Sequence, residues 1–231
     1  MCWLPNHKVI YVVQDLHQSL TATLSNVIPQ ASLLVQRLPQ VPEVKLALLN
    51  DSYPQHELDS DAVSYIMDNP LYWAFCWASG QVLARYILDH PELVVGQRVL
   101  DFGAGSGVVA IAAALAGASS VIACDLQYSS LDACCYNAGL NGVSLSLSDD
   151  FFKTPEVDVI LAADVLYDRE NLGWLEIFNG KAERVLVADS RIRDLNVASF
   201  FPVAQVISST IPDLDESAEF KRVTIYSNVR G

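Results

Sequence analysis

Hydrophobic positions near the start of the chain follow the period of a helix. Apolar residues recur three or four positions apart until Pro29, which ends the pattern, so we predict an amphipathic helix with one buried stripe. Proline residues punctuate the next segment, where the apolar run 44–49 predicts a short strand. We expect residues 1–68 to form an N-terminal cap that packs on the rest of the molecule or on a partner. The stripe comprises Val9, Val13, Leu16, Leu20, Leu24 and Val27.

From Arg98 onward, short apolar runs alternate with helical stretches. This alternation is typical of βαβ units and a parallel sheet. The run 157–162 is almost continuously apolar, as expected of a central strand covered on both faces. The expected strands are 98–100, 120–124, 143–147, 157–162 and 184–188, and the expected helices are 82–88, 108–116, 130–140 and 169–178.

The helical pattern fades after Phe200. Residues 203–207 and 220–226 have the pattern of two strands, joined through the turn-rich segment 212–216. We therefore expect the sheet to end in a hairpin-like pair. Residues 69–231 are predicted to form one α/β domain with helices on both faces of the sheet.

Length and composition support one buried core. The chain has 231 residues, of which 52% are hydrophobic and 18% charged, a balance that excludes intrinsic disorder. The formal charge of -13 leaves no basic surface able to neutralise several phosphates, so we expect no nucleic-acid partner. A neutral or cationic substrate fits the acidic balance better.

No segment indicates export or a membrane span. The first eight residues lack an apolar core, and the most apolar stretch, 108–123, is interrupted by Gly117, Ser119 and Ser120. The five cysteines show no C-x-x-C spacing, which favours a reducing, cytoplasmic location, and the four histidines lack metal-ligand spacing. We expect a soluble protein without a membrane partner and without a metal.

A glycine-rich loop links the first predicted strand of the sheet to the next helix. Gly103, Gly105 and Gly107 alternate directly after Asp101 and Phe102, and three alternate glycines exceed what a simple turn requires. Glycine permits positive φ and close approach of a ligand, while free N–H groups at the helix start face that ligand. The loop predicts a small-molecule site.

The charge beside this loop bears on which ligand binds. Residues 105–110 also satisfy the dinucleotide pattern G-x-G-x-x-A. A dinucleotide would place a pyrophosphate against the loop, where Asp101 would repel it, whereas S-adenosylmethionine presents an ammonium and a sulfonium that a buried carboxylate favours. The sequence thus favours S-adenosylmethionine as the cofactor and leaves NAD as the alternative.

Acidic residues follow the next two predicted strands. Asp125, followed by Leu126, lies about 20 residues past the loop, where a carboxylate can accept hydrogen bonds from both ribose hydroxyls; a helix N-cap is the alternative role. Asp150 can take the adenine amino group and Phe151 can pack on the purine, although both fit plain loop positions nearly as well. We place all four residues in the cofactor site.

Asp164 and Tyr167 leave the predicted central strand at its carboxyl end, where ligands of open α/β sheets bind. A substrate amine must be held by acceptors and be neutral before it attacks a methyl group, so these side chains could orient it and help remove its proton. The alternative makes Asp164 a helix cap and Tyr167 a packing residue. The aromatic cluster 72–77 could wall the cofactor or the substrate, or serve core packing alone.

At these residues the chain resembles the seven-strand, class I S-adenosylmethionine-dependent methyltransferases, and more narrowly the electron-transfer flavoprotein β-subunit lysine methyltransferase family. The resemblance covers about residues 42–226. The motifs that carry it are Pro42-Glu43-Val44-Lys45-Leu46, Tyr72-Trp73-Ala74-Phe75-Cys76-Trp77, Gly80-Gln81, Ala84-Arg85-Tyr86-Ile87-Leu88-Asp89, the glycine loop, Asn137 with Asn141, the D-x-x-Y element from Asp164 to Tyr167, and Ala188-Asp189-Ser190-Arg191.

The resemblance implies a Rossmann-like, mostly parallel seven-stranded sheet with an antiparallel strand at its C-terminal end. It also implies that Asp164 and Tyr167 lie at a substrate lysine. The cofactor contacts that it implies come from Trp77, Asp101, Gly103, Gly105, Asp125 and Asp150.

The sequence departs from the family pattern at two places. Ala78-Ser79-Gly80 stands where the family commonly has Pro-Gly-Gly, and Ser190 replaces a Pro-Gly turn before Arg191. The resemblance implies N-methylation of a lysine in a protein such as the flavoprotein β-subunit or a ribosomal stalk protein. The alternatives are a small-molecule amine methyltransferase, a NAD-dependent oxidoreductase and a non-catalytic binding module.

Overall fold

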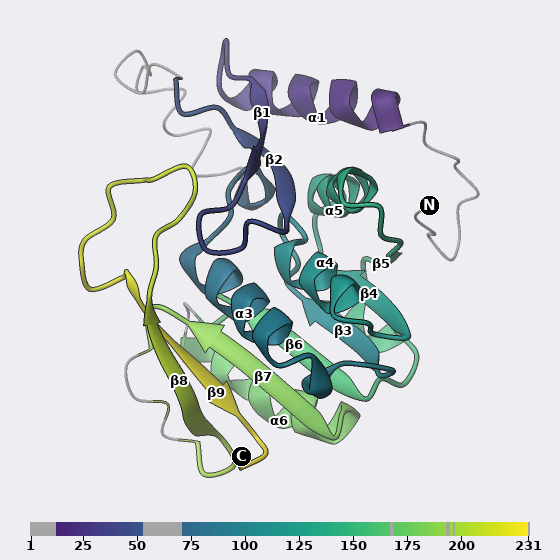
Figure 1. The fold of residues 1–231 in the computed structure, drawn as a ribbon, viewed down its shortest axis with the longest axis vertical. Helices are drawn as coiled ribbons and strands as arrows, with labels where there is room; N and C mark the ends of the chain where they lie inside the picture. Colours follow the sequence, from purple (N-terminus) through teal and green to yellow (C-terminus); the bar gives the residue numbers. More distant parts are fainter. Residues whose placement is uncertain (1–12, 53–70, 167–168, 193–194, 196, 231) are drawn as a thin grey trace.

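The computed structural model describes residues 13–52, 71–166, 169–192, 195 and 197–230 (Figure 1). Its strands β3 (Arg98–Phe102), β4 (Ser120–Cys124), β5 (Ser146–Ser148), β6 (Val159–Ala163), β7 (Arg184–Asp189), β8 (Phe201–Ile207) and β9 (Arg222–Ser227) form one sheet. The strand order is β5-β4-β3-β6-β7-β9-β8. Neighbouring strands from β5 to β7 are parallel, while β9 is antiparallel to β7 and to β8. This confirms the predicted α/β fold and its C-terminal antiparallel strand.

Alternate residues of the central strands contribute to two hydrophobic cores, one on each face of the sheet. Val99 of β3 and Leu161 of β6 belong to one core, while their neighbours Leu100 and Ile160 belong to the other. A sheet covered on both faces requires this pattern, because successive side chains point to opposite sides. The nearly continuous apolar run of β6 follows from it.

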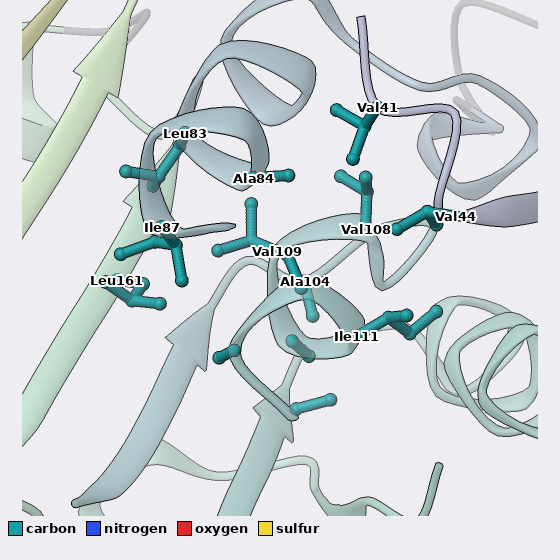
Figure 2. Packing of buried hydrophobic residues seen from close by; sticks show 14 of the residues in the cluster. Val41, Val44, Leu83, Ala84, Ile87, Ala104, Val108, Val109, Ile111 and Leu161 are labelled. Carbon is teal, nitrogen blue, oxygen red and sulfur yellow. The ribbon is translucent and has the colours of Figure 1, made fainter. Parts of the chain in front are cut away.

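Helices cover both faces of the sheet. α3 (Ala78–Asp89), α4 (Val108–Leu115) and α5 (Tyr128–Leu140) lie on one face, and α6 (Trp174–Lys181) lies on the other (Figure 1). Figure 2 shows Leu83, Ala84 and Ile87 of α3 beside Val109 of α4 above Leu161 of the sheet. The short 3-10 helices are η2 (Tyr72–Ala74), η3 (Pro91–Leu93), η4 (Phe151–Lys153) and η5 (Arg169–Gly173).

The N-terminal segment packs on the face that carries α3, α4 and α5. It contains α1 (Val13–Val27) and a separate antiparallel hairpin of β1 (Leu33–Arg37) and β2 (Lys45–Leu49). Four residues of the predicted stripe pack with Tyr136 of α5 in one cluster: Leu16, Leu20, Leu24 and Val27. Val9 lies outside the described residues. Val41 and Val44, between the two hairpin strands, lie beside Val108 (Figure 2). The predicted boundary of the cap at Asp68 lies outside the described residues.

Several element boundaries differ from the predictions. α3 begins at Ala78 rather than at residue 82, and the helix expected over 169–178 is divided into η5 and α6. β5 begins at Ser146 rather than at residue 143. The Val143 N–H bonds to the Ala138 carbonyl oxygen, so this residue is part of the turn that follows α5. β1 has no counterpart among the predicted strands. Among the described residues, no helix is long and apolar enough to cross a membrane.

Candidate active site

The glycine loop between β3 and α4 has three glycines with positive φ, and they meet different surroundings. φ is 69° at Gly103, 51° at Gly105 and 81° at Gly107. A Cβ atom at Gly103 would lie 2.8 Å from Val165 Cγ1, which would have to shift, and one at Gly107 would lie 3.1 Å from the backbone of α5, which is a tight contact. At Gly105 the nearest atom, the carbonyl oxygen of Tyr72, would be 3.9 Å away. Gly105 is therefore the position where the loop leaves room for a ligand.

Asp101, in β3, is a buried carboxylate that forms no ion pair among the described residues. It lies two residues before Gly103, it is only 2% exposed, and Oδ2 accepts the N–H of Ala110 in the first turn of α4 at 2.9 Å. Burial above all, with a smaller contribution from the charge of Asp125, raises the pKa of Asp101 to about 8, although the Ala110 hydrogen bond opposes the rise. A cation bound beside the loop would stabilise the ionised form of this group.

Asp125 braces the glycine loop from the end of β4. Oδ2 accepts the N–H of Gly105 at 3.0 Å, and Oδ1 accepts the N–H of Gln127, just before α5, at 2.9 Å. Burial raises the pKa of Asp125, and these two hydrogen bonds oppose the rise. Leu126 is 85% exposed, so its side chain is accessible to a ligand. The N-cap residue of α5 is Gln127, so Asp125 is not the helix cap that the alternative supposed, and the contact of Asp125 with a ribose stays a prediction.

Asp150 and Phe151 follow β5, and the structure separates their roles. The carboxylate of Asp150 pairs with Lys153 Nζ at 2.9 Å and accepts the N–H of Phe152, and both contacts lower its pKa. The ring of Phe151 is 5% exposed and packs edge-on against Phe102 in the core beneath α6. Because that ring is enclosed in the core, its burial argues against the predicted packing on a purine. The contact of Asp150 with adenine stays a prediction.

Asp164 directly follows β6 and receives hydrogen bonds from two other elements. Its φ of 53° lies in the left-handed region, which residues other than glycine rarely adopt. Oδ1 accepts the hydroxyls of Ser79 at 2.6 Å and Ser190 at 2.9 Å, and Oδ2 accepts the Ser79 N–H at 3.2 Å. Burial above all, with the charge of Asp189, raises the pKa of Asp164 to about 6, and the serine hydrogen bonds oppose the rise. Asp164 therefore also accepts an N–H from the first turn of α3, whose N-cap residue is Trp77; Tyr167 lies outside the described residues.

Asp189, at the end of β7, was not predicted as a site residue from the sequence. It is 1% exposed and accepts the N–H groups of Leu166 at 3.3 Å, Arg191 at 2.7 Å and Ile192 at 2.8 Å. These bonds fix the loops that leave β6 and β7 on either side of Asp164. The sequence did offer one signal for this residue. Asp189 follows the end of a predicted strand, as the predicted site residues Asp125 and Asp164 do.

Trp77 directly precedes α3 and lies in the aromatic segment beside the glycine loop. Its ring is partly exposed, and Nε1 donates to the Tyr72 carbonyl oxygen at 3.1 Å. The same oxygen is the atom nearest to the open space at Gly105. The structure therefore brings Trp77 and the loop to one place, as the resemblance implied, and its contact with a cofactor stays a prediction.

Asn137 of α5 connects the glycine loop with the N-terminal hairpin. The side chain is fully buried, Nδ2 donates to the Ser106 carbonyl oxygen at 2.8 Å, and Oδ1 accepts the Ala47 N–H at 2.9 Å. One turn later, Asn141 accepts the Lys45 N–H at 2.8 Å and donates to the Lys45 carbonyl oxygen at 2.7 Å. The two asparagines bind the edge of β2 through its backbone, a role that the sequence did not reveal.

These groups gather where an open α/β sheet binds ligands. β3 and β6 are adjacent, and the chain proceeds from β3 toward one edge and from β6 toward the other, which defines a switch point. Val165, next to Asp164, contacts the position of Gly103, so the glycine loop and Asp164 are close neighbours. The arrangement offers a cationic ligand the buried carboxyl of Asp101, which can ionise beside it, and offers a second reactant the hydrogen-bonded carboxylate of Asp164.

Comparison with known protein families gives consistent matches. A family model described as Ribosomal protein L11 methyltransferase (PrmA) matches residues 84–168. The electron transfer flavoprotein beta subunit lysine methyltransferase of Rattus norvegicus is 38% identical over 127 residues, 51% of this chain and 50% of that protein. A homolog of that enzyme from Caenorhabditis elegans is 33% identical over 171 residues, 64% of this chain and 69% of that protein. The chain spans about half the length of several curated relatives that it matches.

A solved structure supports the fold. The T. thermophilus 16S rRNA N2 G1207 methyltransferase (RsmC), in complex with AdoMet and guanosine, superposes with a TM-score of 0.53 at 13% identity. The match covers 87% of this chain and 51% of that chain. At this identity the likeness concerns the fold alone.

Proposed function

Since the chain belongs to the electron transfer flavoprotein beta subunit lysine methyltransferase family, we propose that it transfers a methyl group from S-adenosylmethionine to a lysine side chain of a protein. Membership follows from a relative at 33% identity of which the chain spans 69%. The proposal concerns the activity, the cofactor and the substrate. Relatives are named for the flavoprotein subunit and for ribosomal protein L11, so these two proteins are the first candidate substrates.

The residues of the glycine loop fit a cationic nucleoside cofactor. Gly105 leaves open space, and Asp101, just before the loop, is a buried carboxyl without an ion-pair partner among the described residues. Asp125 accepts the N–H of Gly105 in the same loop, and Trp77 bonds to the Tyr72 carbonyl oxygen that faces Gly105. When bound, S-adenosylmethionine supplies an electrophilic methyl group on a sulfonium. A bound cation can draw Asp101 into its ionised form and gain a charge pair, whereas a pyrophosphate gains no such pair, which favours S-adenosylmethionine over the dinucleotide alternative.

Asp164 carries the proposal for catalysis. With a pKa of about 6 it is ionised at neutral pH, so it can attract a lysine ammonium and then accept a hydrogen bond from the neutral amine. Its carboxylate is held by α3 and by the residue after β7, so the amine is oriented by a fixed acceptor. The single observation behind this role is a buried, multiply hydrogen-bonded carboxylate at the switch point beside the glycine loop.

Methyl transfer itself is tested with isotopically labelled S-adenosylmethionine. Purified protein is incubated with the flavoprotein β-subunit, with ribosomal protein L11 and with whole lysate, and the proteins are analysed by mass spectrometry. We expect a labelled methyl group on lysine. Label confined to metabolites would support a small-molecule amine methyltransferase instead. Binding of S-adenosylmethionine without any labelled product would support a non-catalytic binding module.

The role of Asp164 is tested by Asp164→Asn. Asparagine tolerates the left-handed backbone and keeps an acceptor for the serine hydroxyls, but it removes the charge that holds an ammonium. We expect turnover to fall by at least about 100-fold while the affinity for S-adenosylmethionine, measured by calorimetry, stays within a few fold.

The matched control is Asp158→Asn, which makes the same change just before the amino end of β6. Asp158 pairs with Arg98 far from the carboxyl ends of the strands, so this variant should keep its turnover. Unchanged turnover in Asp164→Asn would remove Asp164 from the mechanism.

A further inference from the structure

Two serines from separate elements meet at one oxygen of Asp164. Ser79 lies in the first turn of α3, and Ser190 directly follows β7. Their hydroxyls donate to Oδ1 at 2.6 Å and 2.9 Å. We propose that Ser79 and Ser190 are positioning residues that keep Asp164 ionised and turn its Oδ2 toward the substrate amine. This inference rests on the proposed function, because it gives Asp164 an amine to bind.

The hydrogen bonds divide unequally between the two carboxylate oxygens. Oδ1 accepts both hydroxyls and a long hydrogen bond of 3.4 Å from the Ser190 N–H. Oδ2 accepts only the Ser79 N–H, at 3.2 Å, among the described residues. A carboxylate oxygen offers about two lone-pair directions, so Oδ1 is saturated and Oδ2 keeps one. Oδ2 is therefore the atom that can accept a hydrogen bond from an incoming amine.

The surroundings of Asp164 otherwise oppose its charge. Asp189 at the end of β7 is a second carboxylate, and Cys76 is a fully buried thiol whose own pKa is raised by burial and by the charge of Asp164. No lysine or arginine forms an ion pair with Asp164 among the described residues. The ionised form thus depends on hydrogen bonds, and hydroxyl donors to a carboxylate are among the stronger kind.

The network is rigid enough to orient a reactant. Ser79 is fully buried and Ser190 is 9% exposed, so neither hydroxyl is mobile in solvent. The Asp164 N–H bonds to the Ala188 carbonyl oxygen at 2.9 Å, which anchors the left-handed backbone to β7. An unfavourable conformation persists when surrounding contacts over-determine it, and such positions are concentrated at functional sites.

The test measures the titration of Asp164 in cofactor-free protein by 13C NMR of labelled aspartate, with the signal assigned by its loss in Asp164→Asn. Ser190→Ala and, separately, Ser79→Ala should raise the titration midpoint by roughly one pH unit. Ser190→Thr keeps the hydroxyl and should restore the original midpoint. Ser208→Ala is the matched control, because Ser208 is 3% exposed and its hydroxyl bonds to no described residue.

Turnover gives the second readout. The loss of activity in Ser190→Ala relative to the unsubstituted protein should be several-fold near pH 6.5 and should shrink toward pH 8.5, where Asp164 is ionised in both proteins. An unshifted titration, or an equal loss at every pH, would overturn the proposal that the serines keep Asp164 ionised. A further outcome is that the titration shifts but the unsubstituted protein methylates no lysine. The proposed function and the orientation of Oδ2 toward an amine would then both be wrong. The effect of the serines on the ionisation of Asp164 would still hold.

Discussion

At the scale of single residues, the carboxyl of Asp101 is held in a state that a carboxyl in water would not adopt. Among the described residues, the Ala110 N–H is its one hydrogen-bond donor, and burial raises its pKa to about 8. At neutral pH without a ligand the group is mostly protonated. Binding of a cation would favour its ionised form, so occupation of the loop and loss of this proton are linked.

The buried carboxyl predicts a pH-dependent stability. In the unfolded chain an aspartate ionises near pH 4, whereas folded Asp101 keeps its proton up to about pH 8, so the folded state binds more protons and its stability falls as pH rises between these values. Asp101→Asn has no such proton. Between pH 6 and pH 8 we expect the unsubstituted protein to lose roughly 1 kcal/mol per pH unit relative to Asp101→Asn, measured by urea unfolding.

The control for this measurement is Asp158→Asn, which changes a carboxylate whose pKa is lowered to about 2 by Arg98. The stabilisation from that pair is present above the unfolded pKa and is lost only as pH falls toward 2. Relative to this variant, the stability of the unsubstituted protein should differ by a constant amount between pH 6 and pH 8. A constant difference relative to Asp101→Asn as well would contradict the raised pKa.

At the scale of elements, the glycine loop combines a packing requirement with a binding requirement. A Cβ atom at Gly103 would overlap Val165 after β6, and one at Gly107 would crowd Cys134 of α5, so both glycines allow close packing around the loop. Gly105 has space for a Cβ atom, and its N–H is bonded to Asp125. The sequence motif alone does not distinguish the roles of the three glycines, which differ only in the atoms that surround each one in the folded protein.

This difference predicts the effect of Gly105→Ala. The substitution introduces a Cβ at φ 51° without a clash, so we expect a loss of about 1 kcal/mol in unfolding free energy. Gly142→Ala is the matched control, since its φ is 67° and nothing lies within 4 Å of the added Cβ. The two variants should be similarly stable, but only Gly105→Ala should weaken S-adenosylmethionine binding, by at least about tenfold. Equal affinities in calorimetry would show that the ligand does not approach Gly105.

Element boundaries show which structure is encoded locally. Residues 108–116 and 120–124 were predicted almost as they occur, α4 and β4, because their apolar patterns and flanking glycines are local signals. The start of α3 was predicted too late, because the side chain that accepts an N–H from its first turn is Asp164, 85 residues away. The predicted site residues Gly103, Asp125, Asp150 and Asp164 follow the ends of β3, β4, β5 and β6 as expected. The sequence did not show that Phe151 packs in the core, because its partner Phe102 lies in β3, far away in the chain.

At the scale of the whole molecule, the N-terminal segment and the cofactor loop are parts of one hydrogen-bonded assembly. The Asn137 side chain bonds to Ser106 of the loop and to Ala47 of β2, 90 residues away in the chain. α1 packs on the same helix, α5, that carries Asn137. We therefore expect that loosening the N-terminal segment would also disturb the geometry of the glycine loop, because α5 contacts both.

Two asparagine substitutions test this connection. Asn137→Ala leaves the buried Ser106 carbonyl and Ala47 N–H without partners, so we expect a loss of roughly 2–4 kcal/mol in unfolding free energy. Asn141→Ala removes the neighbouring bonds to Lys45 and should also destabilise the hairpin, but it does not touch the loop. At a temperature where both variants are folded, only Asn137→Ala should weaken S-adenosylmethionine binding. Equal weakening would mean that the hairpin acts through general stability, and no weakening in either would mean that the loop keeps its geometry without Asn137.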